Sequence, residues 1–367
     1  MKKNITARQS PRGSKPIPQP ITIGLDLGDK SSRCCELEGE AMRESSVATT
    51  KKAMRQKFGP MRRCRMAIEV GAHSRWVNRL LTELGHEVYV ANPRQTRLIS
   101  QSSRKDDRLD AQTLARLARV DPQLLRPIRH RSEEAQQDLT VIRARTRLVE
   151  ARTSLVNMAR STVKASGERL PKCDADQMGV ERSENLPEPL RETLKPLLEA
   201  VESLTEKIRQ YDEKIEQIAR EKYPETKLLK QVSGVGTLIA LTFVLTLEDK
   251  ERFQKSRDVG CYLGLRPRRS ESGARQPQLG ISKEGDMYLR KLLVQGAHGI
   301  VRRRSPDTNL KRWGLKLAER GGKNAKKRAI VAVARKLGIL LHRLWVTAEV
   351  YEPLRTIPVR QRLRPAA

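Results

Sequence analysis

Two short apolar runs, each carrying a single acid, constrain the fold of this chain more than any other feature. The first run is Ile21–Leu27, which holds Asp26, and the second is Arg65–Val70, which holds Glu69. Apolar runs of this length, bounded by turn residues, are typical of buried β-strands. A lone carboxylate in such a run is costly without a partner, so each acid implies a metal ion or a buried basic residue nearby.

The segments around these two runs alternate between strand and helix patterns. Weaker strand patterns lie at 34–37 and 45–49, a clearer one at 86–91, and helical patterns at 50–58, 74–84 and from 104 onward. The first run and the two weaker strands can form a meander. Strand, meander, helix, strand, helix, strand, helix is the order of an RNase H-like domain. We therefore predict an α/β domain with a mixed sheet over residues 20–130.

The helix that begins near Arg104 adds two more acids. Asp107 and Asp110 are three positions apart, which places both carboxylates on one helical face. Acids this close repel unless a cation lies between them, and ligands that are all oxygen suit Mg²⁺ or Mn²⁺. The alternative is an ordinary solvated helix start, where acids are favoured. With Asp26 and Glu69 at strand ends of the same domain, we predict a metal site made by the four acids.

The charge of the chain indicates a polyanionic partner. It has 74 Lys and Arg against 43 Asp and Glu, a net charge of +31, and only 3% aromatic residues. Such an excess suits phosphate backbones, whereas the scarcity of aromatic residues argues against a platform for stacking single strands. Five scattered cysteines without a C-x-x-C pair disfavour a zinc site and fit a reducing compartment.

The ends of the chain carry no membrane signal. Residues 1–19 read as a flexible basic arm without an apolar signal region, and the tail from Tyr351 is basic and loose. No run approaches transmembrane length. We expect a cytoplasmic protein.

The middle of the chain, residues 131–226, is predicted to be helical. Residues 132–165 form one helix, residues 166–189 an aperiodic, mobile connection, and a second regular helix is expected to start at Pro196. A heptad seam follows, made by Leu197, Val201, Leu204, Ile208, Tyr211, Ile215 and Ile218. This seam predicts either a helical hairpin within one chain or a coiled coil that joins protomers into a dimer or tetramer.

The remaining residues, 227–350, are predicted to form an all-α domain. Val232–Gly236, with Gly234 and Gly236, resembles a helix-hairpin-helix turn whose backbone N–H groups can approach a phosphate, although a plain turn is an equal alternative. Helices are expected at 237–247, 256–263, 285–303 and 325–345. Between them, an arginine-rich loop leads to Ser272. By its chemistry alone this serine is a turn residue or a nucleophile held among cations, and the turn is favoured.

The combination of these motifs resembles the DEDD transposases of the insertion-sequence group often called IS one-ten. The matching residues are Gly24–Asp26, Ile68–Glu69, Lys105–Ala111, Gly234–Gly236, Tyr262–Leu265, Ser272–Gly273 and Gly280–Gly285, in the order of the family. The resemblance implies a RuvC-like domain whose metal ligands and catalytic acids are Asp26, Glu69, Asp107 and Asp110. It also implies a coiled-coil segment, a C-terminal transposase domain with Ser272 as nucleophile, and recombination of element ends and target DNA guided by a structured RNA of the same element.

Two departures from the family pattern leave alternatives open. Asp106 stands where a small polar residue is usual and can replace Asp107 as a ligand, and Glu271 places a negative charge beside Ser272. Ser270 and Ser282 are therefore alternative nucleophiles. The expected nucleic-acid contacts are Gly234, Gly236, Arg266, Arg268, Arg269, Arg275 and Lys283. Other functions that fit the residues are a RuvC-like metal-dependent endonuclease without serine chemistry, and a basic nucleic-acid-binding scaffold.

Overall fold

The computed structural model describes residues 21–92, 107–270, 272, 277 and 279–354. The chain divides into two compact units, one ending at His130 and the other beginning at Arg131. Each unit is described by itself. The finer division of the second unit, at residues 226 and 350, stays a prediction.

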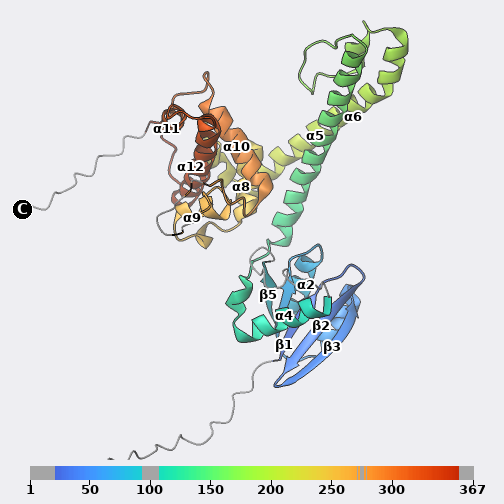
Figure 1. The fold of residues 1–367 in the computed structure, drawn as a ribbon, viewed down its shortest axis with the longest axis vertical. Helices are drawn as coiled ribbons and strands as arrows, with labels where there is room; N and C mark the ends of the chain where they lie inside the picture. The colour runs from blue at the N-terminus through green and yellow to red at the C-terminus, as the bar shows by residue number, and fades with distance from the viewer. Residues whose placement is uncertain (1–20, 93–106, 271, 273–276, 278, 355–367) are drawn as a thin grey trace, which may run out of the picture. The chain divides into compact units, whose positions relative to one another are not determined.

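The N-terminal unit contains a five-stranded sheet in the order β3-β2-β1-β4-β5 (Figure 1). Its strands are β1 (Thr22–Asp26), β2 (Ser31–Glu38), β3 (Ala41–Ala48), β4 (Arg65–Glu69) and β5 (Glu87–Ala91). The first three strands form an antiparallel meander, and β4 and β5 run parallel to β1. The predicted mixed sheet of an RNase H-like domain is thereby confirmed.

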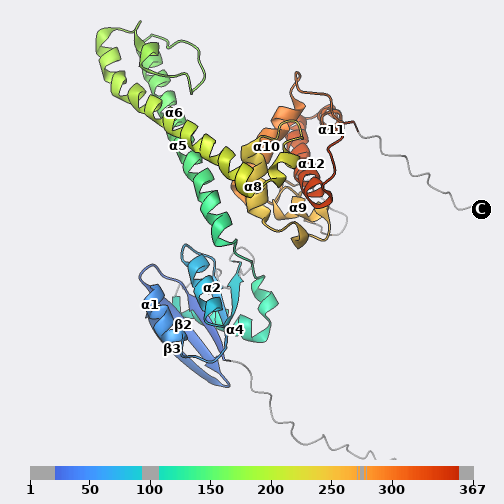
Figure 2. The same cartoon turned by 180° about the vertical axis from the view of Figure 1, so that it is seen from behind.

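Helices cover both faces of this sheet (Figure 2). On one face, α1 (Lys51–Phe58) and α2 (Ser74–Glu83) bury Ile23 and Leu25 of β1. On the other face lies α4 (Asp107–Val120), whose Leu114 and Ala118 pack with Ala67 of β4. Because side chains alternate along a strand, Gly24 and Asp26 of β1 point to the α4 face, as do Ala67 and Glu69 of β4. The short helix η1 (Pro122–Leu125) follows α4.

The second unit begins with two long antiparallel helices, α5 (Glu133–Ala165) and α6 (Glu188–Lys222). Pro196 lies inside α6, so the expectation that this residue starts the helix is wrong. Leu194 and Leu198 on either side of the proline are buried against Val156 and Val163 of α5, and this packing holds the helix together across it. The two helices therefore form a hairpin within one chain, which is one of the two predicted arrangements of the seam.

The connection between α5 and α6 is packed rather than extended. It contains one short helix, η2 (Val180–Ser183), and otherwise lacks regular structure. Met178 and Leu186 nevertheless belong to the apolar cluster at this end of the hairpin. The aperiodic sequence predicts the missing regular structure but not this packing.

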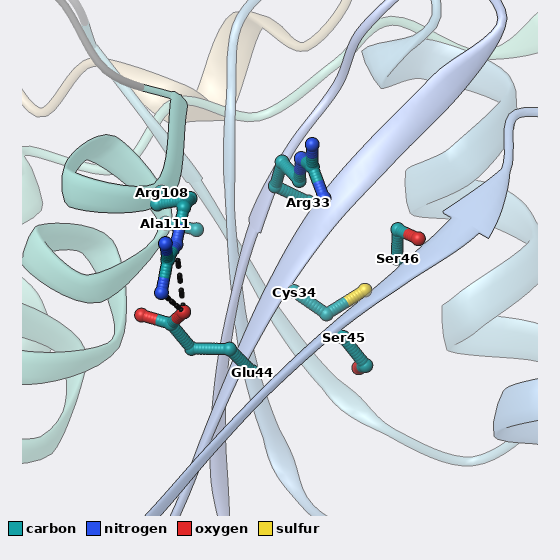
Figure 3. Close-up of a pocket in the computed structure, with 7 residues that line it drawn as sticks. All are labelled: Arg33, Cys34, Glu44, Ser45, Ser46, Arg108 and Ala111. Atoms are coloured by element: carbon teal, nitrogen blue, oxygen red, sulfur yellow. Dashed lines mark hydrogen bonds and ion pairs between the residues drawn. The ribbon is translucent and has the colours of Figure 1, made fainter.

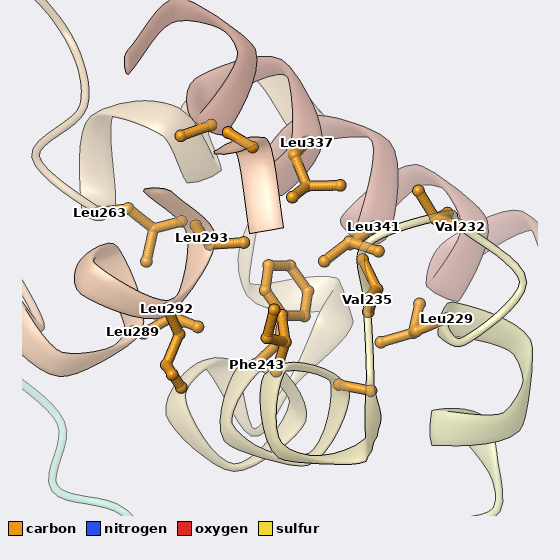
Figure 4. Packing of buried hydrophobic residues seen from close by; sticks show 14 of the residues in the cluster. Leu229, Val232, Val235, Phe243, Leu263, Leu289, Leu292, Leu293, Leu337 and Leu341 are labelled. Atoms are coloured by element: carbon orange, nitrogen blue, oxygen red, sulfur yellow. The ribbon is translucent and has the colours of Figure 1, made fainter. Parts of the chain in front are cut away.

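Helices after residue 224 surround one apolar core (Figure 4). They are α7 (Glu225–Leu229), α8 (Thr237–Leu247), η3 (Lys250–Arg252), α9 (Ser256–Tyr262), α10 (Met287–Val301), α11 (Asn309–Ala318) and α12 (Ala325–Thr347). Phe243 of α8 lies at the centre, with Leu293 of α10 and Leu337 and Leu341 of α12 around it. Within the described part of the chain, no helix combines the length and the apolar character needed to span a bilayer.

Candidate active site

Two of the predicted acids lie side by side at the ends of parallel strands. Asp26 is the last residue of β1, and Glu69 is the last residue of β4. The register of these strands pairs Leu25 with Ile68, so the two acids occupy the next position on each strand. Both are half-buried and lie on the α4 face of the sheet. The sheet therefore brings together two carboxylates that are far apart in the sequence.

A close backbone contact sets α4 directly on β1. A Cβ atom at Gly24 would lie 2.0 Å from the carbonyl oxygen of Ala111 and 2.5 Å from the amide nitrogen of Ala115. Only glycine leaves room for a helix backbone at this distance. Because Ala111 follows Asp110 directly, this contact places the first turns of α4 beside the end of β1.

The start of α4 is also held from the side of β3. Arg108 Nε donates a 2.8 Å hydrogen bond to Glu44 of β3 (Figure 3). Gln112 donates to the same carboxylate. These bonds lower the pKa of Glu44. A hollow of about 300 Å³ lies beside the contact, lined by Arg33, Cys34, Glu44, Ser45, Ser46, Arg108 and Ala111. The helix turn that carries Asp107 and Asp110 is thus tied to the sheet through Arg108.

The electrostatics of Asp26 reflect the other three acids. Burial, followed in order of size by the negative charges of Asp107, Asp110 and Glu69, raises the pKa of Asp26 to about 6. Charges act at this strength only over short distances. Asp107, Asp110 and Glu69 therefore lie close enough to Asp26 to raise its pKa through electrostatic repulsion. Asp106, the alternative ligand, lies outside the described residues.

The four carboxylates fit a hard divalent cation by their donor chemistry. They offer only oxygen, the ligand that Mg²⁺ and Mn²⁺ prefer, and their mutual repulsion favours a cation among them. In the described residues, no three His, Cys, Asp or Glu side chains converge into a complete ligand set. The four acids thus have the donor composition for a divalent metal ion.

A histidine that the sequence analysis missed lies at the same end of the sheet. His73 is the residue before α2, and its Nδ1 accepts a 3.1 Å hydrogen bond from the indole N–H of Trp76. Since the indole nitrogen can only donate, a neutral His73 carries its proton on Nε2, which lies 3.4 Å from Asp29. Asp29 and His73 follow β1 and β4 in the sequence. The one sequence signal for Asp29 and His73 as site residues is that each follows a strand that ends in an acid.

The predicted nucleophile lies on a two-stranded ribbon in the second unit. Residues 267 and 281 form an antiparallel bridge, and Arg268 N donates to the carbonyl of Gly280 at 2.9 Å. Ser272 lies beyond this pairing and is exposed. Of the alternatives, Ser270 is also exposed, whereas the Ser282 hydroxyl is buried and no partner reaches it among the described residues. Exposure therefore favours Ser272 and Ser270 over Ser282.

The predicted cations occupy the same ribbon. Arg266, Arg268 and Arg269 are exposed before Ser272, and Lys283 is exposed at the end of the returning segment. Arg275 and Glu271 lie outside the described residues. The ribbon thus presents positive charge on both of its segments.

The two glycines of the predicted hairpin turn have different surroundings. Gly234 has a φ of +83°, and an added Cβ would lie 2.8 Å from the carbonyl oxygen of Gly296 in α10. Gly236 precedes the first residue of α8, and an added Cβ there would meet nothing within 4 Å. The first glycine therefore serves the packing of the core, and only the second has open space in front of its backbone.

An RNase H-like sheet with acids at two strand ends and on the following helix, joined to a basic helical unit, is the architecture expected of a transposase of the DEDD type. Two family models match it: the DEDD transposase model of the IS110 group covers residues 23–166, and the model described as Transposase IS116/IS110/IS902 family covers residues 226–311. The chain belongs to this IS110 group and is a DNA transposase.

Curated relatives carry names of the same kind. The chain is 29% identical over 261 residues to the transposase for insertion sequence element IS1111A of Coxiella burnetii, which covers 68% of this chain and 69% of the relative. It is 28% identical to a probable family 20 transposase of Pseudomonas aeruginosa, over 90% of this chain and 98% of the relative. A transposase for element IS1328 of Yersinia enterocolitica is 28% identical, over 78% and 86% of the two chains.

Proposed function

We propose that this transposase cuts and rejoins DNA with a divalent metal ion held by Asp26, Glu69, Asp107 and Asp110, and with Ser272 as the nucleophile. The observation that carries the proposal is the placement of Asp26 and Glu69 at the ends of adjacent parallel strands, beside the first turns of α4. The negative charges of the other three acids contribute to the raised pKa of Asp26. A carboxylate surrounded by carboxylates is unfavourable in a folded protein unless the charge has a use. A metal ion that binds the DNA backbone is such a use.

The metal we propose is Mg²⁺, with Mn²⁺ as the alternative. When bound, such an ion stabilises the negative charge that develops on the phosphate during strand transfer. The chain's own contribution is to hold four carboxylates within reach of one point. Gly24 and Glu44 maintain that arrangement, since the first lets α4 approach β1 and the second holds Arg108.

The covalent step that we propose transfers a DNA phosphate to Ser272. The serine oxygen attacks the phosphorus, the bond from phosphorus to one sugar oxygen breaks, and a serine–phosphate ester forms. The hydroxyl proton leaves the serine, and the released sugar oxygen takes up a proton. No oxidant or energy source is needed, because one phosphoester bond replaces another. In the reverse step, a sugar hydroxyl of another strand attacks the ester and is joined to the phosphate.

Arginines of the ribbon would hold the phosphates on either side of the break. Arg266, Arg268 and Arg269 are exposed next to Ser272, and a guanidinium group can bind a phosphate through two parallel hydrogen bonds. Arg275, close to Ser272 in the sequence, and Lys283 on the returning segment would extend this contact. The backbone N–H groups beside Gly236 would bind a more distant phosphate.

The second candidate is a RuvC-like endonuclease that hydrolyses DNA with the four acids and water. The acidic site alone is compatible with it. The exposed serine among arginines favours the recombinase, because hydrolysis makes no use of a second nucleophile. Recombination leaves strands rejoined to new partners, whereas hydrolysis leaves free ends.

We further propose a structured RNA of the same element as the guide. The net charge of +31 exceeds what one duplex footprint requires, and the few aromatic residues point to an RNA held by its backbone and shape. Base pairing would then choose the DNA. The family resemblance, rather than the charge, supplies the guiding role.

Self-association through the α5–α6 hairpin is a further part of the proposal. Arg145 pairs with Asp212, and Arg152 with Thr205, which sets the register of the two antiparallel helices. In this register, three positions of the heptad seam on α6 and three apolar positions of α5 lie on the same flank of the hairpin. They are half-buried and largely apolar: Val141, Leu148 and Leu155 on α5, and Leu197, Leu204 and Tyr211 on α6. This hairpin flank suits the same flank of a second copy.

A single assay separates these functions. Purified protein is incubated with the ends of its own element, a target duplex, Mg²⁺, and the transcript of the flanking non-coding sequence. We expect rejoined strands only when the transcript is present. Free cut ends without rejoining would indicate the endonuclease, and full rejoining after ribonuclease treatment would exclude the RNA guide.

A further inference from the structure

A hollow in the second unit lies at the base of the ribbon that carries Ser272. It has a volume of about 790 Å³, within the range of pockets that take small ligands. The ribbon contributes one wall, and α11 and α12 contribute the other. The residues that line it are Leu265, Pro267, Leu279, Gly280, Ile281, Lys283, Leu317, Arg320, Asn324, Ala325, Lys327, Arg328, Ala329, Val331, Ala332 and Arg335.

The inner wall of this ribbon pocket is apolar and contains several small side chains. Small residues of α12, at positions 325, 329 and 332, recur at helical spacing and leave the space open. Leu265, Ile281 and Val331 supply apolar surface around it. Such a wall suits a flat ring system, which can lie between aliphatic side chains when aromatic residues are absent.

The polar lining of the ribbon pocket is almost entirely cationic. Lys283, Arg320, Lys327, Arg328 and Arg335 line it, and no Asp or Glu of the described residues does. The Nε atom of Arg335 is buried, and within the described residues no hydrogen-bond partner reaches it. A pocket lined by cations, with no carboxylate of the described residues in its lining, attracts an anion. An apolar wall of small side chains beside these cations is complementary to a nucleotide, with its base inside and its phosphate at the rim.

We infer that the ribbon pocket receives one nucleotide that has been turned out of the DNA strand cut at Ser272. This inference rests on the proposed role of Ser272. An intact duplex cannot enter the pocket, because its bases are stacked and paired, whereas a single extruded base can. Pro267 at the pocket and Ser272 are five residues apart, a reach of at most about 17 Å. At about 3.4 Å per nucleotide, the extruded base lies within about five nucleotides of the cleaved phosphate.

Binding experiments without cleavage test this inference separately from the chemistry. The Ser272→Ala protein, which forms no adduct at that residue, is titrated with three probes. They are a plain DNA duplex, the same duplex with one bulged 2-aminopurine, and the RNA counterpart of the bulged duplex. We expect the bulged DNA to bind about tenfold more tightly than the plain duplex, because its extra base is already unpaired. Its fluorescence should change as the base enters the pocket.

Two variants, each with a control, test whether the preference for bulged over plain DNA depends on the ribbon pocket. Ala332→Phe fills it and should abolish the preference for the bulge while leaving duplex affinity unchanged, whereas Ala200→Phe, at an exposed position of α6, should keep it. Arg328→Gln should lower the salt dependence of bulged-DNA binding by about 0.9 in log–log slope. Lys326→Gln, at an exposed position of α12 outside the pocket, should leave the preference for the bulge unchanged. Melting curves verify that each variant is folded.

Three results would overturn the inference. One is equal affinity for bulged and plain DNA, a second is a preference retained in a folded Ala332→Phe protein, and a third is tighter binding of the bulged RNA. None of them affects the proposed serine chemistry, since the Ser272→Ala protein is used throughout. Conversely, a missing covalent adduct in the active protein would leave these binding results valid.

Discussion

Gly24 of β1 and Ala111 of α4 are in backbone contact, and this contact sets the acids of the helix beside those of the sheet. A Cβ atom at residue 24 would lie 2.0 Å from the Ala111 carbonyl oxygen. Because these neighbours are backbone atoms, which cannot rotate away as a flexible side chain can, a side chain at residue 24 would force α4 to move away from β1. The position of Asp110 relative to Asp26 therefore depends on the absence of one side chain.

Gly24→Ala should destabilise the N-terminal unit and abolish strand transfer. We expect a loss of about 1–3 kcal/mol in the free energy of unfolding, the usual cost of overpacking a core. Denaturant titration measures this loss, and a recombination assay measures the activity. Gly71→Ala is the matched control, because nothing lies within 4 Å of an added Cβ there. Unchanged stability of Gly24→Ala would show that α4 is not held by this contact.

Variants of the acids should separate metal ligands from bystanders. Asp26→Asn, Glu69→Gln and Asp110→Asn should each abolish strand transfer while keeping the melting temperature or raising it, because removing one charge relieves repulsion among the rest. Asp107→Asn should be inactive and Asp106→Asn active. Isothermal titration with Mn²⁺ should show weakened metal binding in the inactive variants alone. The reverse result for residues 106 and 107 would make Asp106 the ligand.

The fold of the N-terminal unit was predictable because its signals are local. The strand patterns that end in Asp26 and Glu69 fix both the parallel pair and the face on which the acids lie. The Gly24–Ala111 contact and the bond from Arg108 to Glu44 join segments far apart in the sequence, so no local pattern reveals them. The ribbon pocket was missed for the same reason.

Two errors in the helical unit have specific physical causes. Pro196 lacks a backbone N–H and normally marks a helix start, but Leu194 and Leu198 bury enough apolar surface to keep the helix continuous. Helix α11 was not predicted, although Thr308 caps it by accepting a hydrogen bond from Lys311 N at 3.0 Å. Its buried residues are only Leu310 and Gly314, too few for a clear apolar stripe.

Charges on the hairpin flank should disrupt self-association without unfolding the hairpin. We expect Leu155→Asp combined with Leu204→Asp to lower the mass measured by light scattering, because these half-buried side chains would face the second copy. Ser203→Asp, at an exposed neighbouring position of α6, should leave the mass unchanged. A folded double variant of unaltered mass would mean that the hairpin does not join protomers.

Stability of the second unit should depend on His342. Burial lowers the pKa of His342, whose Nδ1 lies 3.0 Å from the Ser256 hydroxyl and whose Nε2 lies 3.0 Å from the Lys250 carbonyl. The folded state thus favours the neutral ring. Its stabilisation is complete above the ordinary pKa of 6.5 and declines as the pH falls below that value, because the unfolded chain then binds more protons.

Unfolding free energies measured between about pH 7 and pH 5.5 test this dependence. The wild-type protein should lose stability over this range, and the slope should be smaller in His342→Gln. His298→Gln is the control, since this histidine is exposed on α10 and its removal should leave the slope unchanged. Equal slopes for all three proteins would exclude a role for His342.

The most direct test of the account is to identify the residue that becomes joined to DNA. Protein, transcript, Mg²⁺ and element ends are mixed and quenched in denaturant, and the covalent species is digested and sequenced by mass spectrometry. We expect a nucleotide attached to the peptide that contains Ser272, lost in Ser272→Ala and retained in Ser270→Ala and Ser282→Ala. Attachment at another residue, or efficient strand exchange by Ser272→Ala, would contradict it.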